Sequence, residues 1–596
     1  MYKSLLTCLL LLFLMIPAKA QENTNERARW FTDARFGMFI HWGLYSAAEG
    51  YWKGEKLRHN NDYAEWIFYR NQIEREEYLG LLDRFDWEVI DPEEWVILAK
   101  EAGMKYVTIT AKHHDGFGLW NSRASDYDLG NYTSRDIIKE MATACKKHGL
   151  KLGLYYSHWV DWEHPYGWSH EREIHGITPE EYDQYWQEKV IPQVRELLTN
   201  YGDISLMWFD MWINHSETVV TRAQLLQLKN MIRELQPGCL VNSRLGLSME
   251  EDPDIDFKTL GDNQLGNKKE DFPWQSPATV AHSWGFHSSD TQWKSTSTLL
   301  KSLIGNASLN GNFMLNIGPR ANGEVPYEIR QRLLEMGEWL KVNGEAIYGT
   351  QAFDVETNLH DWGKMTCKGQ NGKFNLYLHV YNWPISQKLF LTGINGTPNK
   401  AYLLADKEKS PLSFNHNSVF TEIELPYDQP DPYVSVIVLE YDQRPEAVAG
   451  LVAKTSDGGY ALRPDNQVTE NKNQQLIAAS KYGTVPAHLN VIKEQTLKWK
   501  IFIDKPGDKK IDVSYSFQGN PNDAAFTIRS NNQEITSKIQ ATGLTVGEPN
   551  EDWHIQRFKA LHLGDISFSQ PGLYEIELRI TPSMSAPVKF QWLWIK

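Results

Sequence analysis

The sequence has little cysteine and no long run of basic residues. Its 596 residues include only four cysteines, and its formal net charge is −15. Four cysteines without a C-x-x-C pair do not make a disulfide scaffold or a typical zinc site. A negative chain without a basic cluster also lacks the electrostatic footprint of a nucleic-acid-binding protein. We therefore expect neither a disulfide-stabilised mini-protein nor a nucleic-acid partner.

Long apolar runs are missing after the N-terminus. Residues 1–20 combine a basic start, an apolar stretch from Leu5 to Ile16 and small residues before Gln21, as a secretory signal peptide does. This stretch is shorter than the ~20 residues that cross a bilayer, and no later segment comes closer. We expect an exported protein, periplasmic or secreted, with no membrane span after cleavage.

Residues 26–349 alternate short apolar segments with longer amphipathic ones. Helices with N-terminal cap signals are predicted at 91–103, 133–149, 178–202 and 221–238. Strands are predicted at 38–40, 106–110, 151–155, 204–208, 239–242 and 313–317, with another at 279–281 and one early strand left unplaced. This pattern predicts a (β/α)8-like barrel. The alternative, a doubly wound sheet, would carry a G-x-G-x-x-G turn after the first strand, and the sequence has none there.

After residue 349 the pattern changes to short alternating strands. Residues 350–445 are predicted to form a β-sandwich domain. Residues 446–596 are predicted to hold a polar linker, around 455–473, and a second β-sandwich. The fold class is thus α/β, a (β/α)8-like barrel followed by two all-β sandwich domains.

Polar side chains follow five of the predicted strands, at the end where a barrel carries its active site. They are His41, His113–Asp115, His158, Asp210 and Arg244. Three aromatic residues and a methionine surround Asp210 in the sequence, and such a setting penalises an ionised carboxylate unless partners offset the cost. We interpret Asp210 as a nucleophile or base, with a helix cap or a buried ion pair as the alternative.

The adjacent pair His113 and His114 permits two interpretations. Histidine is a common zinc ligand, but adjacent residues on an extended segment point to opposite sides, and no H-E-x-x-H motif is present. Hydrogen bonding to substrate hydroxyls requires only that a turn brings both imidazoles to one pocket. We favour hydroxyl binding, with no metal and no organic cofactor.

Aromatic residues are abundant, with 23 Trp and 27 Tyr. Most are expected in the core, because their bulk and apolar area favour burial. A sugar ring has an apolar face that stacks on aromatic rings, so some of them suit a sugar pocket. The candidates are Trp42, Trp66, Trp159, Trp208 and Trp284.

Several motifs together resemble glycoside hydrolase family 29, the α-L-fucosidases, over residues 28–445. The last domain resembles a carbohydrate-binding jelly roll only loosely. The motifs lie at Arg35–Gly43, Asp91–Trp95, Ala102–Tyr106, Lys112–Phe117, Gly153–Ser157, Trp208–Asp210 and Gly311–Pro319.

The resemblance implies a retaining enzyme that releases terminal L-fucose from fucosylated glycans through a covalent intermediate on Asp210. Retaining glycosidases use a second carboxyl group, ~5–5.5 Å from the nucleophile, as acid and base. The resemblance also implies a set of fucose-binding residues. These are His41, Trp66, His113, His114, Tyr156, Trp208, Arg244 and Trp284.

The sequence departs from the family at one position. Many members have a Pro-Trp-Glu segment whose glutamate is the acid/base, whereas this chain has Gln275, which has no titratable proton. Glu65, just before the pocket residue Trp66, is the favoured replacement. A nearby loop acid is the second possibility, and the candidates are Asp262, Glu270 and Asp271.

Three other functions stay open from the sequence. The protein could be a catalytically weakened or silent fucoside-binding protein, or a related α-L-galactosidase. The third is a metal hydrolase, in which the histidine pair binds zinc. The sequence does not specify the linkage, the aglycone, the ligand of the last domain or the oligomeric state.

Overall fold

The structure is a computed structural model that describes residues 26–57, 63–353, 360–370, 372–468, 474–480, 485–543, 545–546, 555–584 and 586–596. The predicted signal peptide, residues 1–20, lies outside the described residues. Within these ranges, no helix is long and apolar enough to cross a membrane.

Eight parallel strands form the first domain, in the spatial order β7-β6-β5-β4-β1-β10-β9-β8. A parallel bridge between Asn242 and Phe257 joins the two outer strands, so the sheet closes on itself. The prediction of a (β/α)8-like barrel is confirmed. The strands are β1 (Phe36–Ile40), β4 (Tyr106–Lys112), β5 (Lys151–Tyr156), β6 (Leu206–Trp208), β7 (Leu240–Val241), β8 (Lys258–Thr259), β9 (Trp274–Thr279) and β10 (Asn312–Ile317).

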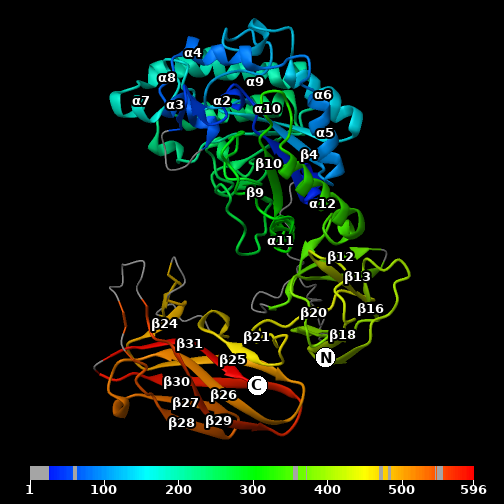
Figure 1. The fold of residues 1–596 in the computed structure, drawn as a ribbon, viewed down its shortest axis with the longest axis vertical. Helices are drawn as coiled ribbons and strands as arrows, with labels where there is room; N and C mark the ends of the chain where they lie inside the picture. Colours follow the sequence, from blue (N-terminus) through cyan, green and yellow to red (C-terminus); the bar gives the residue numbers. More distant parts are fainter. Residues whose placement is uncertain are drawn as a thin grey trace, which may run out of the picture.

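Helices surround this barrel, which occupies the upper half of Figure 1. Their starts follow the predicted caps: the Asp136 side chain accepts a hydrogen bond from Lys139 N, and Thr178 and Thr221 each form a capping box. The longer helices are α5 (Pro92–Glu101), α6 (Ile137–His148), α9 (Ile191–Asn200), α10 (Arg222–Leu235), α11 (Thr296–Ala307) and α12 (Tyr327–Asn343). The shorter ones are α1 (Arg29–Ala34), α2 (Tyr45–Ala48), α3 (Ile67–Arg70), α4 (Arg75–Leu79), α7 (His170–His175) and α8 (Pro179–Tyr185).

Three details differ from the predicted elements. The strand expected at 279–281 is β9, which ends at Thr279. The unplaced strand is β8, two residues long and late in the domain rather than early. The helix expected at 178–202 is interrupted by a π-helical turn at Trp186–Val190, a wider turn that separates α8 from α9.

Two β-sandwiches follow the barrel, as predicted, and lie below it in Figure 1. The first packs a five-stranded sheet against a three-stranded sheet. Its strands are β11 (Gln351–Ala352), β12 (Gly363–Gln370), β13 (Lys373–Val380), β19 (Ser435–Tyr441) and β16 (Lys400–Leu403), facing β14 (Lys388–Thr392), β18 (Phe420–Glu424) and β17 (Phe414–Asn417).

The second sandwich packs a five-stranded sheet against a six-stranded sheet. The predicted linker is partly wrong, because β22 (Tyr460–Leu462) pairs with β31 (Val588–Ile595) inside this sandwich. The first sheet contains β21 (Leu451–Val452), β25 (Gln495–Ile503), β30 (Gly572–Thr581), β27 (Ala525–Ser530) and β28 (Gln533–Lys538). The second contains β23 (Gln475–Ile477), β24 (His488–Val491), β31, β26 (Gly507–Ser516) and β29 (Lys559–Phe568), and β22 is its sixth strand.

The barrel has two apolar cores, one inside the sheet and one between the sheet and the helices. On β1, Phe39 belongs to the inner core, while Met38 and Ile40 belong to the outer one. On β5, Tyr155 faces inward and Tyr156 outward. This alternation follows from the two-residue period of a strand, and it decides which side chains can reach a site at the barrel mouth.

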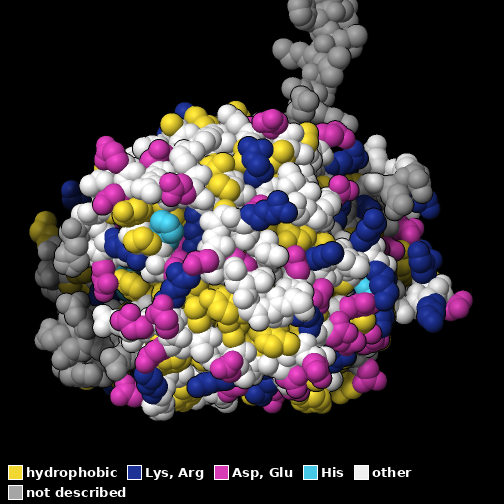
Figure 2. All heavy atoms as spheres, turned by 90° about the horizontal axis from the view of Figure 1, so that it is seen from above, with side chains coloured by type: hydrophobic (Ala, Val, Ile, Leu, Met, Phe, Trp, Pro, Cys, Tyr) yellow, Lys and Arg dark blue, Asp and Glu magenta, His cyan; other side chains and the backbone are white. Residues whose placement is uncertain are grey.

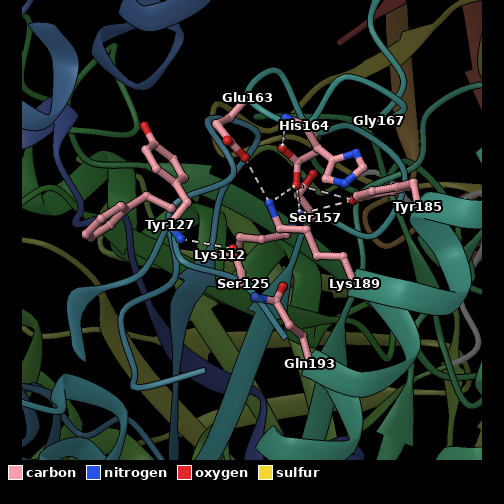
Figure 3. A network of polar contacts seen from close by, with 12 residues as sticks. Lys112, Ser125, Tyr127, Ser157, Glu163, His164, Gly167, Tyr185, Lys189 and Gln193 are labelled. Atoms are coloured by element: carbon pink, nitrogen blue, oxygen red, sulfur yellow. Dashed lines mark hydrogen bonds and ion pairs between the residues drawn. The ribbon is translucent and has the colours of Figure 1, made fainter. Parts of the chain in front are cut away.

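A buried network of charges fixes the loops that follow β4 and β5 (Figure 3). The carboxylate of Asp161 lies 2.7 Å from Lys112 Nζ and 2.9 Å from Lys189 Nζ, and Lys189 also contacts Glu163 at 3.2 Å. Burial lowers the pKa of Lys112 to about 8, although the charge of Asp161 opposes this shift. The Asp161 carboxylate therefore compensates two cations that burial would otherwise make costly.

We expect Asp161→Asn to destabilise the barrel by about 3–5 kcal/mol, because the substitution leaves two buried lysines without their shared counter-charge. Thermal denaturation of the intact protein should show a transition several degrees lower. The matched control is Asp126→Asn, which breaks an ion pair with Arg75 at a side chain that is 82% exposed. Such a surface pair contributes about 0–1 kcal/mol, so equal losses in the two variants would contradict the assignment.

Candidate active site

A cavity of about 380 Å³ opens at the carboxyl ends of the barrel strands. Residues that follow β1, β4, β6, β7, β8 and β9 contribute to its wall, so segments far apart in the sequence meet there. Figure 2 looks onto the barrel domain and shows, on its left, histidine and hydrophobic side chains that reach the surface among charged ones.

The structure brings together nine of the ten site residues predicted from the sequence. The exception is Tyr156. The nine that line the cavity are His41, Glu65, Trp66, His113, His114, Trp208, Asp210, Arg244 and Trp284.

Asp210 lies just after β6, where Arg244, Tyr155 and His114 contact its carboxylate. Its Oδ1 lies 2.7 Å from Arg244 Nη1, and its Oδ2 accepts a hydrogen bond from Tyr155 Oη at 3.1 Å and lies 3.5 Å from His114 Nε2. Burial favours the neutral acid, but His114 and Arg244 outweigh burial and hold the pKa of Asp210 below its ordinary value. The side chain is therefore an ionised carboxylate in a largely enclosed site.

Arg244 binds a second carboxylate with its other terminal nitrogen. Nη2 lies 2.7 Å from Asp262 Oδ1 and donates to the carbonyl of Leu260 at 2.8 Å. Because the guanidinium group is planar and rigid, Asp210 and Asp262 are fixed close to each other. The Asp262 side chain is 43% exposed, whereas that of Asp210 is 15% exposed. Asp262 therefore lies at the rim of the cavity.

Glu65 is the buried carboxyl group of the cavity. The residue is 1% exposed, and its Oε2 accepts a hydrogen bond from the backbone N–H of Gly285 at 2.9 Å. Burial raises the pKa of Glu65 to about 7, against the opposing effect of the Gly285 hydrogen bond. Near neutral pH this side chain can thus donate or accept a hydrogen bond.

His41 presents an acceptor atom to the cavity. His41 Nδ1 lies 2.6 Å from Asn316 Oδ1, and the Asn316 amide nitrogen donates to the carbonyl of Trp284. Asn316 Oδ1 is therefore an acceptor, so His41 Nδ1 carries the proton and Nε2 is a free acceptor when the ring is neutral. Burial lowers the pKa of His41 to about 4, which keeps it neutral.

Both members of the adjacent histidine pair reach the cavity, because the chain turns directly after β4. Burial also lowers the pKa of His113. Nδ1 of His114 lies 2.7 Å from Ser157 Oγ, whose hydroxyl donates to the carbonyl of Val160. Among the described residues, no group of three or more His, Cys, Asp or Glu side chains is arranged to hold a metal ion.

Tyr156, which was predicted to bind the sugar, does not line the cavity, whereas the preceding residue, Tyr155, does. Tyr156 points outward from the barrel, and its hydroxyl donates to Gln193 at 2.8 Å. Tyr155 points inward, lines the cavity and binds Asp210. The two-residue alternation of β5 places these neighbouring tyrosines on opposite faces of the sheet.

Three other candidates also lie away from the cavity wall. Trp42 donates its indole N–H to the carbonyl of Arg320, and Trp159 packs against Trp168 with 4.1 Å between ring centroids. His158 Nε2 contacts the carbonyl of Leu245 at 2.9 Å.

Gln275 does not occupy the acid/base position that the sequence motif suggested. It is the second residue of β9, near the amino end of the strand, and it lies buried inside the barrel. Its Oε1 accepts a hydrogen bond from Trp208 Nε1 at 2.9 Å, and its Nε2 donates to Tyr106 Oη at 2.8 Å. Gln275 is thus a structural residue beneath the cavity.

Several residues of the cavity wall were not among the predicted sugar ligands. The sequence pattern gave them no common signal, because most lie on loops or short helices beyond the strand ends. Of the three loop acids that the sequence offered as an acid/base, Asp262 lines the cavity. Glu270 and Asp271 do not. The additional residues are Phe39, Tyr63, Arg70, Tyr155, His170, Trp212, Gly261 and Asp262.

Carboxylates, histidines and tryptophans at the mouth of a barrel define the chain as a glycoside hydrolase by fold and site. A family model described as α-L-fucosidase matches residues 16–345. The chain belongs to the α-L-fucosidase family.

The most similar proteins agree with this assignment. An α-L-fucosidase of Dictyostelium discoideum is 28% identical over 70% of this chain and 90% of its own length. The crystal structure of an α-L-fucosidase from Vibrio sp. strain EJY3 has a TM-score of 0.72 at 27% identity and covers 96% of this chain and 98% of that one.

A third similar structure concerns the reaction. It is a trapped covalent intermediate of a family 29 α-L-fucosidase from Bacteroides thetaiotaomicron, in complex with 2-fluoro-fucosyl fluoride. It is 27% identical, has a TM-score of 0.61 and covers 70% of this chain and 97% of that one.

The buried Glu65 predicts a particular dependence of stability on pH. Its folded pKa of about 7 lies above the ~4.3 of an unfolded glutamate, so the folded state binds the proton more tightly. Stability should therefore fall, relative to Glu65→Gln, as the pH rises from about 4 through 7. The difference in melting temperature between the two proteins, measured from pH 4 to 9, tests this. The contributions of other titrating groups to stability cancel in this difference. Parallel curves of melting temperature against pH would contradict the raised pKa of Glu65.

Gln275→Glu should destabilise the protein without improving catalysis. A carboxylate cannot donate to Tyr106 Oη, whose own proton is donated to Asn312, so a buried charge would lose a partner. The expected loss is about 1–3 kcal/mol. Gln275→Met, which removes both hydrogen bonds without adding charge, is the control and should lose less. A faster hydrolysis of a natural substrate by Gln275→Glu would show that position 275 can act as the acid.

Proposed function

We propose that the chain is an exported, retaining α-L-fucosidase that releases terminal L-fucose from fucosylated glycans through a covalent intermediate on Asp210. The observation that carries the proposal is the Arg244 guanidinium, which holds Asp210 and Asp262 in one cavity. The covalent intermediate of the Bacteroides relative supports the same reaction course.

In the first step, an oxygen of Asp210 attacks the anomeric carbon of fucose. The bond to the leaving oxygen breaks, and an acid donates a proton to that oxygen. In the second step the same group, now a base, takes a proton from water, and the water oxygen attacks the anomeric carbon. Asp210 then leaves as a carboxylate, which the Arg244 contact stabilises.

For the acid/base we propose Asp262 rather than Glu65, which the sequence favoured. Asp262 donates in its protonated form, and its other oxygen can still accept from Arg244. Asp262 shares the Arg244 guanidinium with the nucleophile, which suits the short separation of carboxyl groups in retaining enzymes. It also lies at the exposed rim, where the leaving group departs and water enters. Glu65 lies deeper and is nearly inaccessible.

Glu65 and the histidines are then assigned to the sugar. Glu65 can exchange hydrogen bonds with a sugar hydroxyl, and His41 Nε2 can accept one. Trp208 and Trp284 are almost fully buried in the wall of the cavity and supply apolar surface for the ring or its methyl group. An additional hydroxyl at that methyl position distinguishes L-galactose from L-fucose.

Azide rescue separates the three carboxyl groups. Asp210→Gly should lose activity on an aryl α-L-fucoside by on the order of 10³-fold or more, and azide should then give β-L-fucosyl azide by a single inversion. Asp262→Asn should lose about 10²–10⁴-fold on an oligosaccharide but less on the aryl substrate, and azide should give α-L-fucosyl azide. Glu65→Gln should raise KM without forming either azide. Formation of α-L-fucosyl azide by Glu65→Gln would instead assign the acid/base to Glu65.

The same assays test the competing functions. Saturable fucoside binding without product would identify a silent binding protein, and faster hydrolysis of an aryl α-L-galactoside would identify an α-L-galactosidase. Export is tested separately, by the N-terminal sequence of the protein recovered outside the cytoplasm. A mature N-terminus near Gln21 is expected.

A further inference from the structure

The cavity has a deep part and an exposed rim, and the two parts are lined differently. Phe39, Trp208 and Trp284 form apolar wall in the deep part, with exposures of 1%, 2% and 5%. Trp212 lines the same cavity but is 42% exposed. Of the described tryptophans and tyrosines in the wall, Trp212 is the exposed one, and the others are buried or half-buried.

Other aromatic rings hold Trp212 in place. Its ring centroid lies 4.7 Å from that of Trp159 in an edge-to-face arrangement and 5.6 Å from that of His114. Trp66 and His170 lie within 6.3 Å. Trp159 in turn packs on Trp168. The indole is thus oriented before any ligand binds, which lowers the entropic cost of using its exposed surface.

The position of Trp212 relates this surface to the leaving group. It lies two residues after Asp210, and its neighbour His114 contacts the same carboxylate. A fucose whose anomeric carbon faces Asp210 fills the deep part of the cavity. The group attached to that carbon must then extend past the rim.

On this basis we propose that Trp212 forms the binding subsite for the sugar to which fucose is attached, by stacking on the apolar face of a hexopyranose ring. The inference rests on the proposed function and deepens it. The substrate class is an oligosaccharide with fucose on a neutral hexose, rather than a fucoside with a small or ring-free aglycone.

The experiment compares two substrates that share fucose. One is a disaccharide of L-fucose α-linked to galactose, and the other is α-L-fucosyl fluoride, whose leaving group has no ring to stack. The quantity measured is kcat/KM for the disaccharide divided by kcat/KM for the fluoride. This ratio should fall about tenfold in Trp212→Ala, because only the disaccharide loses the stacking contact. Trp212→Phe keeps a smaller ring and should show an intermediate ratio.

Tyr327→Ala is the matched control. Tyr327 is an exposed aromatic residue of the same domain, 71% accessible and outside the cavity wall, so its removal should leave the ratio unchanged. An unchanged ratio in Trp212→Ala would overturn the subsite while leaving the proposed function intact. If the unmodified protein hydrolysed neither substrate, the proposed function would be wrong, and the subsite with it.

Discussion

One cation organises the site: the Arg244 guanidinium binds Asp210 through Nη1 and Asp262 through Nη2. Without it, two nearby carboxylates would repel each other, and burial would drive the deeper one towards its neutral form. Because arginine stays charged and its donors are fixed in a plane, it keeps Asp210 ionised and also sets the position of Asp262. In the proposed mechanism, the difference in exposure separates their chemical roles, since a nucleophile benefits from enclosure and an acid/base needs contact with the leaving group and water.

The rest of the barrel serves to hold this arrangement. Arg244 and Asp262 come from the short strands β7 and β8, at the place where the sheet closes through the Asn242–Phe257 bridge. On the opposite side, the Asp161 network fixes the loops after β4 and β5, which carry the histidines that face the cavity. Closure and buried charge pairing are therefore conditions for the site as well as for the fold.

The sequence was sufficient for the architecture and for most of the site, because both follow from simple periodicities. Polar residues after apolar strands converge wherever a barrel closes, so Asp210, Arg244 and the histidines were predictable. The sequence did not show as clearly which residues of a strand face the inside of the barrel. The motif contains both Tyr155 and Tyr156, and it does not say which of them faces the inside of the barrel. Strand β8 has two residues, too few to show an alternation.

Gln275 shows why a missing acid in a motif is weak evidence against catalysis. The active end of a barrel strand is its carboxyl end, and Gln275 lies near the amino end of β9, where both atoms of its amide satisfy buried partners. A carboxylate there would be costly, because burial penalises its charge. Asp262, by contrast, lies three residues after β8 and binds the same guanidinium as Asp210. On the proposed mechanism, the catalytic carboxyl groups are those that reach Arg244, so a glutamine at position 275 does not argue against catalysis.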